Sequence, residues 1–254
     1  MTHGILGAGA NWRGIARKVV ERRPEWGVVL VDLRQHGQSE RGEPPHDLAA
    51  CAGDLRALAG ELGGIEAIAG HSFGGKVALA TRALAPPGLR QTWIFDASPS
   101  TRLDRANDPA ETVARLLALM ERSPRTWPRR EDFVQVVVAD GHSRSLGQWL
   151  AMNLVPDDTS GFTLRLDLDA IRAMLADYHA RDLWPVLLDP ALPGTVEVVI
   201  ATRSTVVTAD DRRRLATPPP HVHVHEIDAG HWLHIDAPEA VIDLVARRLP
   251  GGAS

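Results

Sequence analysis

The sequence contains very little cysteine, with Cys51 as the only one among 254 residues. A single cysteine excludes an intrachain disulfide and gives no reason to expect an oxidising compartment. The residues around Cys51 predict a helix in which the thiol packs as a small apolar group. No histidine motif is placed to make it a nucleophile.

Long apolar runs are also missing, and no stretch approaches the roughly 18 apolar residues that a membrane span needs. The first residues lack a charged region followed by an apolar run, so we expect no signal peptide and a cytoplasmic location. The formal net charge is −4 and basic residues form no block, so neither nucleic acid nor an anionic membrane is an expected partner. Hydrophobic residues make up 44% of the chain, as in an ordinary soluble globular protein.

Short β-branched segments alternate with helical ones, which predicts a mostly parallel, doubly wound sheet. Strands are expected at 28–31, 65–70, 93–96, 195–201 and 221–227, and helices at 47–62, 73–84 and 241–249. Between 98 and 193 this alternation stops, and the helical spacing there predicts helices near 109–122, 131–139, 146–154 and 168–183. We therefore expect an α/β core, residues 1–98 and 194–254, with a helical cap inserted at 99–193.

The pentapeptide Gly70-His71-Ser72-Phe73-Gly74 has the form G-x-S-x-G. It follows an expected strand and opens an expected helix, which is the context of a nucleophilic serine on a tight turn. The N–H of Phe73 would then lie at a helix N-terminus and stabilise developing negative charge. A glycine-rich turn that merely contains serine is the alternative, and the strand and helix around Ser72 disfavour it.

A histidine and a second glycine turn complete this interpretation. His231 follows the last expected strand, where the order Ser…acid…His places the catalytic base. The His3-Gly4 turn at the start of the chain is of the type that supplies a second oxyanion donor, here the N–H of Ile5. Gly4, Gly7 and Gly9 could also suggest phosphate binding, but no strand precedes them and no P-loop Lys-Ser pair follows.

With these motifs the chain resembles the α/β-hydrolase superfamily, and within it the small bacterial carboxylesterase/thioesterase group related to mitochondrial abhydrolase-domain proteins. The matching segments are His3-Gly4-Ile5-Leu6-Gly7 with Asn11-Trp12, Val31-Asp32-Leu33-Arg34-Gln35-His36-Gly37-Gln38-Ser39, Gly70-His71-Ser72-Phe73-Gly74-Gly75-Lys76 and Gly230-His231-Trp232-Leu233-His234. The resemblance covers almost the whole chain and is looser in the cap. It implies a Ser-His-acid triad that needs neither cofactor nor metal.

The resemblance also bears on the acid. Many α/β-hydrolases carry it in the loop after the strand before last, where this chain has Arg203, which cannot orient an imidazole. The esterase group instead carries it after the strand that follows the serine turn, which here gives Asp96. Asp96 is the expected acid and Asp210 the fallback. Asp210 and Asp211 are otherwise interpreted as capping acids of a helix.

In this fold the strand that leads into the His3-Gly4 turn is central, between the strands expected at 28–31 and 65–69. Relatives carry about two further strands before it, and these are missing from the sequence. We therefore expect unpaired backbone in the middle of the sheet, and interpret the start of the chain as assigned too late.

The leading expectation is a serine hydrolase acting on carboxylic esters, with acyl thioesters left open. A cofactor-free C–C hydrolase or lyase, or a perhydrolase, is the alternative within the fold. Arg144, Arg165 and Arg172 are possible partners for a dicarboxylate in the lyase case. A catalytically inactive scaffold is the alternative from another class. Alternating His221, His223 and His225 share one strand face, but nothing around them supports a metal site. The sequence leaves the oligomeric state open.

Overall fold

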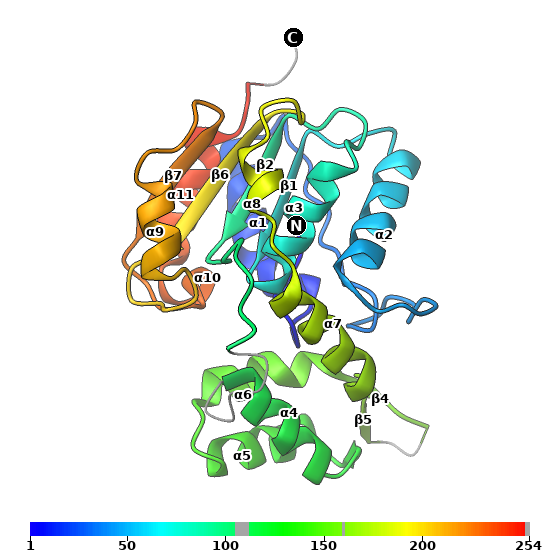
Figure 1. Cartoon of the computed structure of the whole chain (residues 1–254). Helices are drawn as coiled ribbons and strands as arrows, with labels where there is room; N and C mark the ends of the chain where they lie inside the picture. Colours follow the sequence, from blue (N-terminus) through cyan, green and yellow to red (C-terminus); the bar gives the residue numbers. More distant parts are fainter. Residues whose placement is uncertain (105–111, 159–160, 252–254) are drawn as a thin grey trace.

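The structure is a computed structural model that describes residues 1–104, 112–158 and 161–251. Its larger part is a layered α/β unit, and a smaller, mostly helical part lies below one edge of it (Figure 1).

The central sheet consists of parallel strands in the order β1-β2-β6-β7. Their bounds are β1 Ala67–His71, β2 Gln91–Phe95, β6 Thr195–Ala201 and β7 Val222–Ile227. Four of the expected strands are thus confirmed, with ends shifted by a few residues. Every residue of β2 is buried, because helices cover both faces of the sheet.

The prediction of a regular strand at 28–31 is wrong. Only Val31 forms an isolated parallel bridge, and its partner is Thr2, which also bridges Gly70 of β1. Beside this bridge, the N–H of Val31 donates to Met1 O at 3.0 Å and the N-terminal ammonium of Met1 donates to Val29 O at 2.7 Å. The expected place of the segment before the His3-Gly4 turn, between 28–31 and β1, is therefore confirmed. A cavity of about 560 Å³ lies between residues 27–31 and β1.

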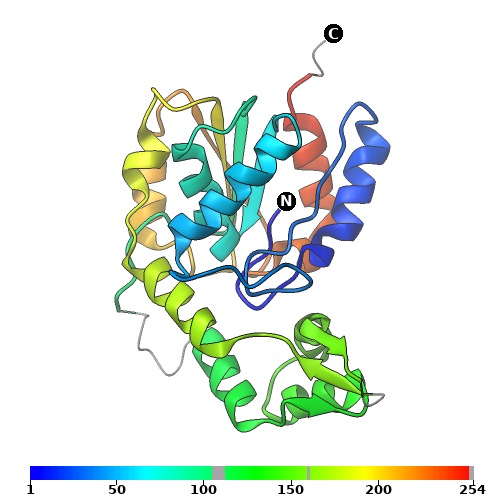
Figure 2. The ribbon, with the colours of Figure 1, turned by 90° about the vertical axis from the view of Figure 1, so that its right-hand side faces the viewer.

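Helices cover the sheet on both sides (Figure 2). α1 and α11 pack against each other on one face, while α2 and α3 pack together on the other. The bounds are η1 Gly9–Trp12, α1 Arg13–Arg22, α2 Leu48–Glu61, α3 Phe73–Ala83, α9 Ala209–Leu215, α10 Leu233–Asp236 and α11 Pro238–Arg248. The helices expected at 47–62, 73–84 and 241–249 are confirmed, and Cys51 is buried in α2 as expected.

The segment expected to form the cap is mainly helical. Its helices are α4 Thr112–Arg122, α5 Arg130–Ala139, α6 Arg144–Leu150, η2 Ala151–Asn153, α7 Leu168–Ala180 and α8 Trp184–Leu188. The beginning of the helix expected at 109–122 lies outside the described residues. A small antiparallel sheet, order β3-β5-β4, was not predicted; its strands are β3 Thr126–Trp127, β4 Leu154–Pro156 and β5 Phe162–Leu164. Strands of two or three residues are too short to show an alternating pattern.

Two buried cations on α3 bind the ends of this segment to the core. The Nζ of Lys76 donates to the carbonyl oxygens of Ser100, Tyr178 and Arg181 at 2.7–2.8 Å. Arg82, also fully buried, donates to carbonyl oxygens of residues 186, 189, 192 and 194. The helix α3, which has the predicted nucleophile Ser72 at its start, therefore also binds both ends of the inserted segment.

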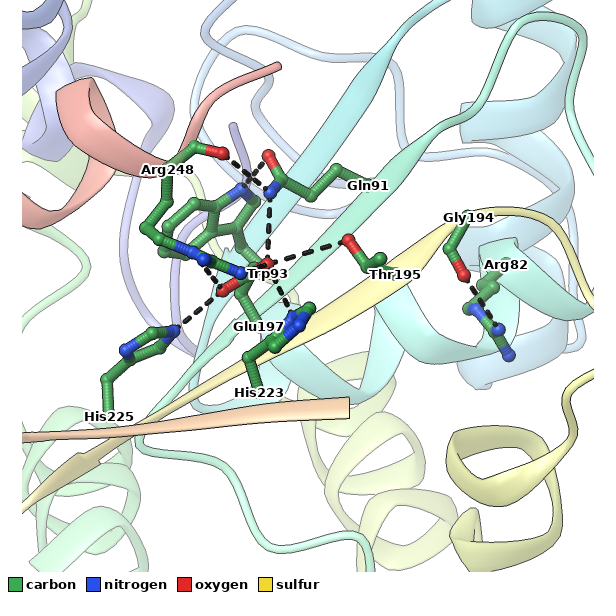
Figure 3. A network of polar contacts seen from close by, with 9 residues as sticks. All are labelled: Arg82, Gln91, Trp93, Gly194, Thr195, Glu197, His223, His225 and Arg248. Carbon is green, nitrogen blue, oxygen red and sulfur yellow. Dashed lines mark hydrogen bonds and ion pairs between the residues drawn. The ribbon is translucent and has the colours of Figure 1, made fainter. Parts of the chain in front are cut away.

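A buried carboxylate organises the amino ends of the strands (Figure 3). Glu197 lies in β6 with no exposed surface and accepts hydrogen bonds from Gln91, His223, His225 and Arg248 at 2.6–3.1 Å. The side chains of His223 and His225 are partly exposed. Their common partner was not predicted, because the sequence shows Glu197 only as one charge within an apolar run.

Candidate active site

Ser72 lies between β1 and α3 in a backbone conformation that L-residues rarely adopt, with φ 53° and ψ −116°. Such strain is common at functional sites. The glycines on either side are required by space. A Cβ on Gly70 would lie 2.0 Å from the carbonyl oxygen of Gly74, and a Cβ on Gly74 would lie 2.5 Å from the carbonyl oxygen of His3. The sharp turn therefore depends on both glycines of G-x-S-x-G.

The structure brings Ser72, His231 and Asp96 into one hydrogen-bonded series. His231 Nε2 lies 3.1 Å from Ser72 Oγ, and His231 Nδ1 lies 2.7 Å from Asp96 Oδ2. Because a carboxylate can only accept, Nδ1 carries the proton and Nε2 is free to accept one from the serine. This is the relation expected of a nucleophile, a base and an orienting acid.

The Asp96 carboxylate is fully buried and held on both oxygens. Its second oxygen, Oδ1, accepts a hydrogen bond from the backbone N–H of Ala201 at 3.2 Å. The backbone N–H of Asp96 donates to Val199 O at 2.7 Å. Asp96 itself has φ 45°, which turns the side chain out of the line of β2 toward His231. The carboxylate therefore has little freedom to move away from the imidazole.

The other carboxylates considered for this role point elsewhere. Asp210 lies exposed in the first turn of α9 and pairs with Arg213. Asp211 forms a capping box with Thr208 and accepts hydrogen bonds from Ser98 Oγ at 2.7 Å and Ser100 Oγ at 2.5 Å. The interpretation as a helix-capping residue is confirmed for Asp211, whereas Asp210 lies in the first turn and pairs with Arg213.

The predicted oxyanion donors lie next to the nucleophile. A Cβ on Gly4 would lie 3.4 Å from Ser72 Cβ, so the turn that precedes Ile5 is in close contact with the serine. Among the described residues, the N–H groups of Ile5 and Phe73 donate to no backbone or side-chain acceptor. The neighbouring N–H of Leu6, by contrast, donates to His36 Nε2 at 3.1 Å. Both predicted donors are thus left available.

Two buried histidines hold this turn in place. His3 Nε2 accepts the N–H of Leu33 at 3.0 Å, so its Nδ1–H donates to Gly4 O at 2.8 Å. His36 in the same way accepts from Leu6 and donates to Arg34 O. Burial lowers the pKa of His3 to about 4 and that of His36 to about 3, so both stay neutral.

His71, which precedes the predicted nucleophile Ser72, supports the loop of His231. Its Nε2 lies 2.8 Å from His231 O and must donate to it, and the two rings lie 4.6 Å apart. Burial, and then the nearby His231 and His234, lower the pKa of His71 well below its usual value. A neutral His71 adds no positive charge beside His231, the predicted base. No role was predicted for His71, because it occupies a variable position of the G-x-S-x-G motif.

A cavity of about 370 Å³ opens above Ser72 and His231. Its apolar lining includes Ile5, Phe73, Val113, Leu175, Val206 and Trp232. This volume is near the small end of the range for ligand sites, which run from about 300 to 1,000 Å³. The cavity fits a compact substrate group.

The arginines considered for a dicarboxylate are wrong for this cavity, since none of the three lines it. Arg144 and Arg172 pair with Glu131 and Glu121, and Arg165 donates to a backbone oxygen.

Neither a metal site nor a membrane span is found in the parts of the chain that the structure describes. Within those ranges no group of three or more His, Cys, Asp or Glu side chains could hold a metal ion. No helix there combines the length and apolar character needed to cross a bilayer.

The parallel sheet and the serine turn after β1 are typical of α/β hydrolases. Residues 1–244 match the alpha/beta hydrolase family, and the chain belongs to it. Among curated proteins, it is 30% identical over 241 residues to the sn-1-specific diacylglycerol lipase ABHD11 of Danio rerio, covering 93% of this chain and 73% of the relative. It is 26% identical over 253 residues to esterase YbfF of Escherichia coli K12, covering 98% and 91%.

Solved structures give the same fold. A marine microorganism esterase superposes with a TM-score of 0.81 at 21% identity, over 98% of this chain and 93% of that one. An M. tuberculosis esterase superposes with a TM-score of 0.75 at 26% identity, over 98% and 83%. The chain is therefore an α/β hydrolase with esterase- and lipase-like relatives.

Proposed function

We propose that this α/β hydrolase is a serine hydrolase that cleaves carboxylic esters through an acyl-enzyme. The observation that carries the proposal is the series Ser72 Oγ, His231 and Asp96, with contacts of 3.1 and 2.7 Å. Esterase and lipase names among the relatives favour esters as the substrate class.

In the first half of the reaction, Ser72 Oγ bonds to the acyl carbon while its proton passes to His231 Nε2. The carbon–oxygen bond to the alcohol then breaks, and the departing oxygen takes the proton back from His231. In the second half, water gives a proton to His231 Nε2 while its oxygen bonds to the acyl carbon. The bond from Ser72 Oγ to the acyl carbon then breaks, and His231 returns the proton to Oγ, which releases the acid and restores Ser72. Asp96 holds the imidazole and stabilises its positive charge in both halves.

The N–H groups of Ile5 and Phe73 would bind the oxygen that becomes negative in each tetrahedral intermediate. Removing one donor of this kind typically costs about 10²- to 10³-fold in turnover. Both groups belong to the backbone, so they are fixed before substrate arrives, with His3 and His36 holding the turn at Ile5.

The alternatives have less support. The three arginines considered for a C–C lyase, Arg144, Arg165 and Arg172, are not among the residues that line the cavity. An inactive scaffold has no use for the strained Ser72 and the polarised His231. Acyl thioesters remain a second substrate class, since they need the same acyl transfer.

Labelling with a fluorophosphonate probe tests the proposal. We expect Ser72→Ala to abolish labelling and hydrolysis of nitrophenyl acetate and butyrate. Ser204→Ala, a serine that lines the same cavity, should retain both and serves as the matched control. Labelling that persists in Ser72→Ala, or a wild-type protein that neither labels nor hydrolyses any ester or acyl-CoA, would contradict the proposal.

A further inference from the structure

The cavity above Ser72 carries positive charge on one side. Arg102 and Arg203 both line it, and none of the described lining residues is an aspartate or glutamate. Two buried carboxylates lie behind the lining, but each already has partners: Asp96 bonds to His231, and Asp211 bonds to Ser98. A substrate entering this cavity therefore meets two arginine side chains whose carboxylate partners, Asp104 and Asp228, are exposed and lie outside the described lining.

Arg102 is the better placed of the two arginines. Its side chain is 13% exposed, and its Nη1 donates at 3.2 Å to the carbonyl oxygen of Val206, another residue of the lining. Its Nε lies 3.4 Å from Asp104, whose side chain is 71% exposed, so water weakens that ion pair. Its Nη2 has no hydrogen-bond partner among the described residues, and it is not enclosed away from solvent. One arm of the guanidinium is thus left to bind a ligand.

Arg203 stands in the loop after β6 and is more exposed, at 57% of its side chain. Its Nη1 pairs with Asp228 at 2.7 Å, and Asp228 is 80% exposed. This geometry places Arg203 at the solvent side of the cavity, where it adds to the positive potential without being buried. Attraction of an anion to the opening is the contribution expected of such a charge.

We propose that the preferred substrate carries a carboxylate, which Arg102 binds while Ser72 attacks the ester group. The proposal rests on the proposed ester hydrolysis and names the substrate class of that same site. A cavity of about 370 Å³ fits a short chain between the two ends, such as the hemiester of a small dicarboxylic acid. Guanidinium N–H groups match carboxylate geometry, and hydrogen bonds between charged partners are the strong ones.

The test compares each carboxylate ester with its uncharged carboxamide. Ethyl hydrogen glutarate carries the charge on the acyl part, and O-butyryl glycolate carries it on the alcohol part. We expect wild-type kcat/KM to favour the carboxylate of one pair by about 10- to 100-fold, the range expected of one charge-assisted hydrogen bond. The pair that shows this preference tells which side of the scissile bond faces Arg102.

Variants then assign the preference to a residue. Arg102→Gln should reduce the carboxylate-to-amide ratio by at least tenfold, and Arg102→Lys should restore part of it. Arg129→Gln, at an exposed arginine outside the cavity lining, should keep the wild-type ratio. A wild-type ratio near one for both pairs, in protein whose Ser72 labels normally, overturns the carboxylate proposal and leaves ester hydrolysis standing. Absence of labelling would instead refute the proposed function itself.

Discussion

Replacing Glu197 with Gln should destabilise the fold without changing the chemistry at Ser72. The substitution keeps the shape of the side chain and removes its charge, at a position with no exposed surface. Burial alone would raise the pKa of Glu197. Hydrogen bonds from His225 and Arg248 and the charges of Arg248 and His223 outweigh it and lower the pKa to about 2.

The size of the effect follows from linkage. A folded pKa of about 2 against an unfolded value of about 4.5 corresponds to about 3 kcal/mol of stability at neutral pH. In a chain of this size, 1 kcal/mol shifts the Tm by about 2–4 °C, so we expect Glu197→Gln to lower it by about 6–12 °C at pH 7. Because folding lowers the pKa of Glu197, its charge stabilises the folded state. This stabilisation is complete above the unfolded pKa of about 4.5 and is lost as pH falls toward 2.

Thermal melts followed by circular dichroism measure this difference at pH 7 and at pH 3. The gap between wild type and Glu197→Gln should narrow at the lower pH. Glu226→Gln is the matched control, since Glu226 lies on the neighbouring strand with its side chain 62% exposed in a surface ion pair, and it should shift the Tm by less than about 2 °C. Equal melting of Glu197→Gln and wild type at pH 7, or a gap that does not change with pH, would refute the reasoning.

Three further perturbations follow from the geometry. Asp96→Asn should lower kcat by about 10³- to 10⁴-fold while leaving the Tm nearly unchanged, because the imidazole loses its orienting carboxylate; near-normal turnover would remove Asp96 from the site. Lys76→Met keeps the aliphatic stem but leaves three buried carbonyl oxygens without their donor, so denaturant unfolding should show a loss of about 2–4 kcal/mol, and an unchanged midpoint would contradict it. Gly74→Ala places a Cβ 2.5 Å from His3 O, so both the Tm and Ser72 labelling should fall, whereas Gly53→Ala, with open space around it, should be tolerated.

Much of the site could be predicted because its signals are local. The apolar strand before Ser72, the glycines around it and the helix after it are all visible within a short window. His231 was accessible through its place after the last strand. In contrast, the roles of His71 and Arg102 depend on contacts across the fold, with His231 O and with Val206 O.

Predictions about the sheet failed where a strand depends on its neighbours. Residues 28–31 have the composition of a buried strand, yet a strand also requires a ladder of backbone pairs, and within the described residues this segment forms a single bridge, from Val31 to Thr2. The burial of Glu197 was also not predictable from the sequence. The sequence shows it as a single charge in an apolar strand, and only the tertiary structure supplies the partners that allow its burial, Arg248 from α11 and two histidines from β7.

The position of the proposed acid, Asp96, also affects which substrates the cavity can accept. β2 and β6 are neighbouring parallel strands, with Phe95 opposite Val199, so their carboxyl ends lie side by side at one edge of the sheet. Asp96 reaches His231 from the end of β2, and its Oδ1 bonds to the N–H of Ala201 at the end of β6. With the acid supplied by β2, the loop after β6 is free to carry Arg203 toward the cavity. An acid in that loop would repel an anionic substrate, so the use of Asp96 and a preference for carboxylate esters are compatible in one site.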